Sequence, residues 1–295
     1  MRKIIIDTDI GDDADDALAI GLALSANQFN ILGITTVYKN TQMRAKMAKH
    51  LVTLAGHDNI PVHSGMGHSL NNENTVDEIP CQYRKEMEHV HYDGEDAVKF
   101  IAEKLRNERL TIVAIGPLTN IAMLMTTYPE LIGRIEELVI MGGCYYRHVN
   151  EWNIVCDPEA ADIVFKSGVN IKAVGLDVTT KCHFNDDILK SAYEKADTPL
   201  KQLMIDCCEA WLKKTGFTPI LHDPLTIFAL MNESDIQFSP ENIQIELTGK
   251  LTRGMTVCSE DGIWGRKHES PTAVVATALD YQRFIQIFHS NLFLN

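Results

Sequence analysis

Residues 4–20, IIIDTDIGDDADDALAI, are the stretch that decides the fold. The run Ile4-Ile5-Ile6 is continuous and β-branched, which predicts a short strand buried on both faces. From Ala17 the chain becomes apolar and helix-forming, and Gly11 allows the turn that must come between. In an open α/β sheet, ligands bind where a strand ends and a helix begins. That position here holds six aspartates: Asp7, Asp9, Asp12, Asp13, Asp15 and Asp16.

Six carboxylates at one turn repel one another. The N-terminus of a helix stabilises a few of them through its dipole and free N–H groups, but six need a cationic partner. Ligands that are all oxygen indicate a hard divalent cation, Ca²⁺ or Mg²⁺. The alternative is a well-capped helix with a solvated acidic surface, which fits poorly because the preceding strand is too apolar to lie at a surface.

Strands and helices alternate along the remaining chain. We predict strands at 31–37, 60–63, 110–115, 137–141 and 171–176, and late strands at 243–247 and 271–277. Helices are predicted at 41–55, 94–107, 121–127, 185–196, 199–213 and 280–292 and from Asp157 and Asp223, while 65–92 reads as an irregular loop or lid. This order predicts an α/β fold, a mostly parallel, open, Rossmann-like sheet with helices on both faces. We find no repeat or linker, and expect one domain over residues 1–295.

Composition excludes several classes of partner. The net charge of −13 argues against nucleic acid and anionic lipid surfaces. We see no apolar run of about 18 residues, so no membrane span is expected, and MRKIIIDTD does not read as a signal peptide. The seven cysteines include no CxxC pair, which is typical of reduced thiols and predicts a cytoplasmic protein.

Polar or glycine-bearing loops follow each strong strand predicted before residue 150, and parallel topology brings such loops to one edge of the sheet. Taken singly, each motif reads as a turn or a capped helix. Their joint placement with the aspartates favours a shared site. The motifs are Asn40, Ile115-Gly116-Pro117, Gly142-Gly143, Asn150-Glu151-Trp152-Asn153 and His222-Asp223-Pro224.

In this order, the motifs resemble the pattern of the inosine–uridine-type nucleoside hydrolases. The resemblance spans nearly the whole chain. It implies an enzyme that hydrolyses the N-glycosidic bond of ribonucleosides to ribose and free nucleobase, depends on Ca²⁺, and forms homodimers or homotetramers. It is carried by Asp7-Thr8-Asp9-Ile10-Gly11, Asp15-Asp16-Ala17-Leu18, Ile34-Thr35-Thr36-Val37 with Asn40, Ile115-Gly116-Pro117-Leu118-Thr119-Asn120, Met141-Gly142-Gly143, Glu151-Trp152-Asn153 with Asp157-Pro158-Glu159-Ala160-Ala161, and His222-Asp223-Pro224.

The resemblance also implies roles for individual residues. Asp15 is the general base on a water held by the Ca²⁺, and Asp7 supports it. Trp152 stands beside the ribose-binding glutamate, and His222 and His91 lie near the nucleobase, where a histidine suits protonation of the leaving group. The ligands of the Ca²⁺ are Asp9, Asp16, the carbonyl of Ile115 and Asp223, and the ribose is held by Asn40, Glu151, Asn153 and Asp223.

The chain departs from the family pattern in three places. Ile10 replaces the usual proline, and the aspartate run is two residues longer. We align Asp15 and Asp16 with the family pair, because rigid spacing from Asp7 would make Asp13 the base and place Ala14 at a ligand position that alanine cannot fill. Asp13 remains a possible ligand, and the role of Asp12 stays open. Finally, a ribose-binding asparagine before Glu151 has only Asn150 as a candidate, and His89 stands close to His91.

Two other functions are compatible with parts of the sequence. One is a catalytically degenerate, nucleoside-binding or ribose-binding homologue. The other is an aspartyl-phosphate phosphatase, whose Asp-x-Asp opening is present but is followed by Ile10-Gly11 instead of Thr or Val. Base preference is open, with a lean towards broad or pyrimidine-accepting activity. The candidate contacts of the nucleobase are of two kinds. They are the aromatic residues Trp152, Tyr83, Trp211 and Phe217, and the histidines His91 and His222.

Overall fold

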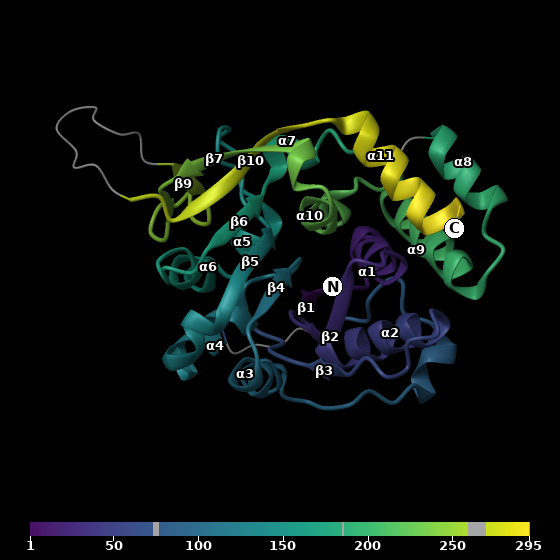
Figure 1. Cartoon of the computed structure of the whole chain (residues 1–295), viewed down its shortest axis with the longest axis horizontal. Coiled ribbons are helices and arrows are strands. Elements are labelled where there is room, and N and C mark those ends of the chain that lie inside the picture. Colours follow the sequence, from purple (N-terminus) through teal and green to yellow (C-terminus); the bar gives the residue numbers. More distant parts are fainter. Residues whose placement is uncertain (73–76, 185, 259–269, 295) are drawn as a thin grey trace.

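The computed structural model describes residues 1–72, 77–184, 186–258 and 270–294. Its centre is an eight-stranded sheet in the order β3-β2-β1-β4-β5-β6-β10-β7 (Figure 1). Every neighbouring pair is parallel except β10 and β7, which run antiparallel. The predicted mostly parallel sheet is therefore confirmed. The strands are β1 (Arg2–Thr8), β2 (Phe29–Thr36), β3 (Val62–Ser64), β4 (Leu110–Ala114), β5 (Ile135–Met141), β6 (Ile171–Val174), β7 (Ile236–Glu241) and β10 (Ala273–Leu279).

Helices cover both faces of this sheet, and β1 shows why its isoleucine run is continuous. Ile4 and Ile6 belong to one hydrophobic core, and Ile5 belongs to the other. All three side chains are fully buried, as expected for a central strand with both faces covered. The first core includes α1 (Asp15–Ser25), α2 (Thr41–Leu54), α9 (Pro199–Thr215), α10 (His222–Met231) and α11 (Tyr281–His289), and the second includes α3 (Ala97–Asn107), α4 (Thr119–Thr127) and α6 (Pro158–Phe165) (Figure 1).

The predicted elements match the observed ones within a few residues, and the missed ones are short. β7 pairs with β10 at the edge of the sheet, and it contains Pro240, which lowers its strand signal but is tolerated at an edge. The predicted helix 185–196 is α8 (Asp186–Glu194), and residue 185 lies outside the described residues. Other missed elements are α5 (Trp152–Cys156), α7 (Leu176–Thr179), the 3₁₀ helices Pro129–Arg134 and Glu233–Asp235, and β9 (Thr256–Cys258), which pairs with β8 (Ile243–Ile245).

The segment predicted to be irregular, 65–92, contains one short 3₁₀ helix, Lys85–His89, and residues 73–76 lie outside the described residues. It packs beside α2, where Lys46 Nζ donates a hydrogen bond to the Glu88 carbonyl at 2.8 Å. A π-helical turn, Ser290–Leu294, follows α11. Across the described ranges we find no helix that is both long and apolar enough to cross a membrane.

The packing of α11 on α10 provides a test of the fold. Phe284 is fully buried, and its ring meets that of Phe228 edge-on at 5.1 Å between centroids. We expect Phe284→Ala to lower the free energy of unfolding in urea by about 3–5 kcal/mol, because the truncation leaves a cavity between the two helices. Phe217→Ala is the matched control, since Phe217 is 75% exposed, and should change stability by less than about 0.5 kcal/mol. Equal effects of the two substitutions would contradict this packing.

Candidate active site

A cavity of about 620 Å³ lies where the central parallel strands end. Its walls come from the loops after β1, β2, β4, β5 and β6, from α5, and from the facing ends of α9 and α10. The cavity brings together most of the side chains expected from the sequence. Those that line it are Asp9, Asp13, Asp15, Asp16, Ile115, Glu151, Trp152, Asn153, His222 and Asp223.

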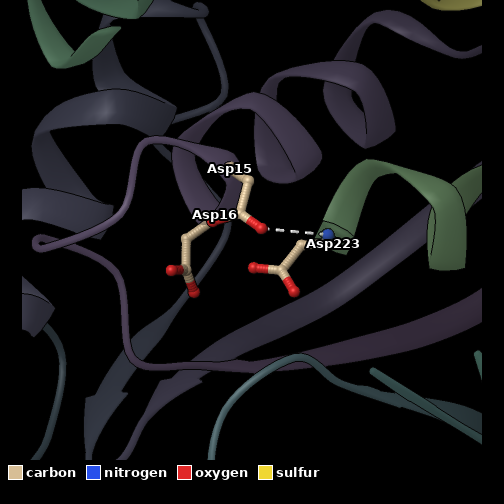
Figure 2. A group of neighbouring side chains, drawn as sticks. All are labelled: Asp15, Asp16 and Asp223. Atoms are coloured by element: carbon tan, nitrogen blue, oxygen red, sulfur yellow. Dashed lines mark hydrogen bonds between the residues drawn. The ribbon is translucent and has the colours of Figure 1, made fainter. Parts of the chain in front are cut away.

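Three of these carboxylates form a compact group. Asp15 and Asp16 lie in the first turn of α1, and Asp223 lies in the first turn of α10. One oxygen of each lies within 4.8 Å of the others, and the side chains point towards one another (Figure 2). The Asp223 N–H donates to Asp15 Oδ2 at 3.2 Å, and Thr8 Oγ1 donates to Asp16 Oδ1 at 2.5 Å. The N-termini of two helices therefore face this negative group, which their dipoles stabilise.

The electrostatics of this trio favour a bound cation. Burial, and after it the repulsion between neighbouring carboxylates, raises the pKa values of Asp15, Asp16 and Asp223 well above the ordinary range. In the described part of the chain, Arg44 and Lys214 form ion pairs with Asp12. No lysine or arginine there forms an ion pair with a member of the trio. Buried oxygen ligands that converge without a cationic partner fit a divalent ion.

Asp9 lies beside the trio but is not one of the three grouped carboxylates. It lines the cavity, and burial raises its pKa to about 6 against the opposing charge of Arg44. A Cβ at Gly116 would come within 2.8 Å of Asp9 Oδ1, so only glycine leaves room for this carboxylate. The sequence led us to expect Asp9 as a ligand and Asp15 as the base, whereas the geometry groups Asp15 with Asp16 and Asp223.

The loop that carries the aspartates is held through its backbone. Arg44, only 1% exposed, donates from Nη1 to the carbonyls of Asp9 and Ile10. The Gln82 N–H donates to the Gly11 carbonyl at 3.0 Å, and its side-chain amide donates to the carbonyls of Asp12 and Asp13. The five successive backbone carbonyls from Asp9 to Asp13 thus all accept hydrogen bonds. We did not identify Arg44 or Gln82 from the sequence, because neither belongs to a recognisable motif.

The two surplus aspartates have different surroundings. Asp12 lies 3.0 Å from Arg44 Nη2 and 2.9 Å from Lys214 Nζ. Burial alone would raise the pKa of Asp12, but the hydrogen bond from Lys214 and the charge of Arg44 outweigh burial and lower it. Asp13 lines the cavity and accepts the Ala14 N–H at 2.6 Å, and burial raises its pKa to about 6. Asp12 and Asp13 therefore both line the cavity, and Asp12 in addition anchors the loop.

On the opposite wall, Glu151 and Asn153 present acceptors. Glu151 caps α5 by accepting the N–H groups of Gly143, Asn153 and Ile154, and burial raises its pKa to about 7. A carboxylate offers about four acceptor positions, so one remains for a ligand. The Asn153 amide nitrogen donates to the carbonyls of Ile115 and Met141, which leaves its side-chain oxygen as an acceptor. This wall suits a ligand that carries hydroxyl groups.

Two of the residues expected in the site do not line the cavity. Asn40 caps α2 by accepting the Met43 N–H at 3.0 Å, and its amide donates to Asp77 at 2.6 Å, so it does not line the cavity. His91 lies with Glu88 and Tyr92 in a separate hollow beside α2, because the segment after the 3₁₀ helix runs along that helix. It is therefore not near a ligand in the main cavity.

His222, by contrast, lines the cavity as expected. Its Nδ1 lies 2.8 Å from Thr179 Oγ1, and burial lowers its pKa to about 4. The ring is therefore neutral at pH 7 and can exchange hydrogen bonds, but it carries no positive charge there.

Comparisons with known proteins agree with this geometry. A family model described as inosine-uridine preferring nucleoside hydrolase matches residues 4–286. The chain is 34% identical to the pyrimidine-specific ribonucleoside hydrolase RihA of Shewanella woodyi, over 99% of this chain and 98% of that protein. It is 31% identical to the inosine-uridine preferring nucleoside hydrolase of Crithidia fasciculata, over 96% and 95%.

Solved structures give the same result. A plant nucleoside hydrolase superposes with a TM-score of 0.87 at 26% identity, covering 100% of this chain and 99% of that one. A purine-preferring ribonucleoside hydrolase from Gardnerella vaginalis superposes with a TM-score of 0.85 at 28% identity, covering 99% and 98%. The names of these relatives include both pyrimidine-specific and purine-preferring enzymes.

The buried carboxylates predict a pH-dependent stability in the absence of cations. The pKa values of Asp7 and Glu151 are raised to about 7, and those of Asp9 and Asp13 to about 6. The folded chain therefore holds protons that the unfolded chain releases near pH 4. The stability that these groups contribute is complete below about pH 4 and is lost as the pH rises towards 7. In EDTA, we expect the melting temperature measured by calorimetry to fall between pH 5 and pH 7.5.

Calcium should reverse this loss, because a cation that binds only the folded state stabilises it by about 2.7 kcal/mol at a hundredfold excess over Kd. We expect the rise in melting temperature to be larger at pH 7.5 than at pH 5, where protons compete. Asp16→Asn should reduce the rise. Asp162→Asn, which alters a surface pair with Lys166, should not. A rise that is the same in both variants would contradict the assigned site.

Proposed function

The chain belongs to the inosine-uridine preferring nucleoside hydrolase family and is a ribonucleoside hydrolase, and we propose that its reaction takes place in the carboxylate cavity. The observation that supports this most directly is the group Asp15, Asp16 and Asp223, buried at the ends of the central strands beside the acceptors of Glu151 and Asn153. Cleavage of an N-glycosidic bond leaves positive charge on the ribosyl group. A wall of carboxylates stabilises that charge as it develops.

We propose that Ca²⁺ is the cation of this site. Asp15, Asp16 and Asp223 would hold it, and the Ile115 carbonyl, which lines the same cavity, offers a further oxygen. All four donor groups offer oxygen, which Ca²⁺ prefers, and its flexible geometry lets water molecules complete a shell of six to eight ligands. When bound, Ca²⁺ lowers the pKa of an adjacent water molecule and orients it.

We assign the proton-accepting role to Asp9 instead of Asp15. The Asp15 carboxylate is one of the three that converge, and one of its oxygens also accepts the Asp223 N–H. Asp9 faces the cavity beside them, with a pKa of about 6. At pH 7 Asp9 is mostly ionised and can take a proton from the attacking water, a contribution of about 10²–10⁴ in rate.

The ribose hydroxyls would donate to the free acceptor positions of Glu151 and Asn153. Trp152 is 61% exposed at the mouth, with its ring edge-on to that of Tyr38, and both line the cavity. We propose that pyrimidine ribonucleosides are among the substrates, as the name of the Shewanella woodyi relative indicates for that enzyme.

The seven cysteines are all free, which fits a cytoplasmic enzyme, and the family resemblance favours a homodimer or homotetramer.

The activity is tested by release of ribose from uridine and inosine, measured with a reducing-sugar assay. We expect release that EDTA abolishes and that added Ca²⁺ restores. Isothermal titration with uridine should accompany the assay. Binding of uridine without ribose release would support the degenerate binding homologue, and phosphate release from a phosphomonoester would support the rival phosphatase.

The two aspartate roles are separated by Asp9→Asn and Asp15→Asn. We expect Asp9→Asn to lower kcat by about 10²–10⁴, because the base is lost, while Ca²⁺ affinity measured by calorimetry stays close to that of the wild type. Asp15→Asn should weaken Ca²⁺ binding, because a charged ligand is lost. The reverse pattern, with turnover lost but Ca²⁺ binding kept in Asp15→Asn and full activity in Asp9→Asn, would return the base to Asp15.

A further inference from the structure

The last turn of α9 forms a wall of the cavity that carries a positive charge, whereas the carboxylate trio is negative. Trp211, Lys214 and Thr215 all line the cavity. Their spacing of three and four residues places them on one face of the helix. This face therefore presents an indole ring, an ammonium group and a hydroxyl to the same space that the carboxylates occupy from α1 and α10.

The Lys214 ammonium is fixed at the rim of the cavity. Its Nζ lies 2.9 Å from Asp12 Oδ1, and Asp12 is itself held by Arg44 at 3.0 Å. An ammonium has three donors, and the contact with Asp12 uses one of them. The Lys214 side chain is 43% exposed, so its remaining donors are accessible to a ligand.

Among the described residues that line the cavity, the other lysine is Lys39. Its Nζ pairs with Glu78 at 2.7 Å, and its side chain is 18% exposed, less than the 43% of Lys214. Of the two histidines expected near the nucleobase, His91 lies in another hollow. His222 lines the cavity, and with Nδ1 on Thr179 Oγ1 it has one ring nitrogen, Nε2, left for a ligand, whereas Lys214 offers an ammonium. Lys214 is therefore the cation best placed to meet a ligand there.

Breaking the N-glycosidic bond separates charge within the substrate. The electron pair of the bond leaves with the nucleobase, and the ribosyl carbon becomes electron-poor until water adds to it. The carboxylates attract the ribosyl end. The departing nucleobase gains negative charge, which an ammonium in the same cavity stabilises more in the transition state than in the substrate.

We propose that Lys214 donates a hydrogen bond to a carbonyl oxygen of the departing nucleobase and so selects substrates whose base carries that carbonyl. This inference rests on the proposed function and names a substrate class for it. Trp211, one turn earlier on α9, offers a flat apolar surface against which the base can stack. An ammonium only donates, so it pairs with the carbonyl of hypoxanthine but not with the amino group that adenine carries at the same position.

The test compares kcat/KM for inosine, adenosine and p-nitrophenyl riboside in matched variants. We expect the wild type to favour inosine over adenosine, and Lys214→Met to lower kcat/KM for inosine by about 10–100-fold, the range for a hydrogen bond to a charged group. Adenosine lacks the carbonyl, and p-nitrophenolate leaves readily without a donor. Both should therefore change by less than about threefold.

Two variants serve as controls. Lys214→Arg keeps a cationic donor and should retain most of the preference for inosine. Lys213→Met removes the exposed neighbouring lysine, which does not line the cavity, and should leave all three substrates unaffected.

Three results would overturn the inference: an equal fall for all three substrates in Lys214→Met, an unchanged ratio of inosine to adenosine, or a wild type without this preference. The equal fall would show that Lys214 acts by holding the Asp12 loop. A wild-type enzyme that releases ribose from none of the substrates would instead overturn the proposed function, whatever Lys214 does.

Discussion

Repulsion between buried carboxylates is the constraint on which this structure depends. The group Asp15, Asp16 and Asp223 must converge to be useful, yet each member disfavours ionisation of the others. Among the described residues, no lysine or arginine forms an ion pair inside this group to offset the repulsion. Such a side chain would occupy the place of a ligand. The fold places the N-termini of α1 and α10 behind the carboxylates and adds one hydroxyl donor, Thr8. These dipoles reduce the cost of the negative charge and leave the space between the oxygens to a cation.

A second layer of buried polar groups holds the strands that carry the site. Asp7 Oδ1 accepts hydrogen bonds from Thr35 on β2 and Asn120 on α4, at 2.6 and 2.7 Å, and the Asn120 side-chain oxygen accepts the Met66 N–H. These contacts join β1, β2 and α4 at the end of the sheet where the loops begin. Asp7 Oδ2 has no hydrogen-bond partner among the residues that the structure describes, and burial raises the pKa of Asp7 to about 7. Partial protonation spares the fold a full unpaired charge at this depth.

The sequence predicts those parts of the site whose chemistry is carried by side chains at strand ends. Ile4 to Ile6 predict a strand buried on both faces. The aspartates after this strand, and Glu151, Asn153 and Asp223, are predicted from their motifs. Arg44 and Gln82 are not, because they bind the backbone carbonyls of the aspartate loop, which every residue offers, from 34 to 70 residues away. The paths of irregular loops are equally hard to predict. His91 has the right residue type, but it lies on a segment that runs beside α2.

The aspartate loop connects these features. Asp12 contacts both Arg44 on α2 and Lys214 on α9. Half-exposed ion pairs contribute little to stability, so the value of the Asp12–Lys214 contact lies in its geometry. It fixes the Lys214 ammonium in the lining of the cavity to which the carboxylates also belong. A substrate that separates charge on cleavage then meets negative groups at its ribose and a positive group at its base, both in place before the reaction starts.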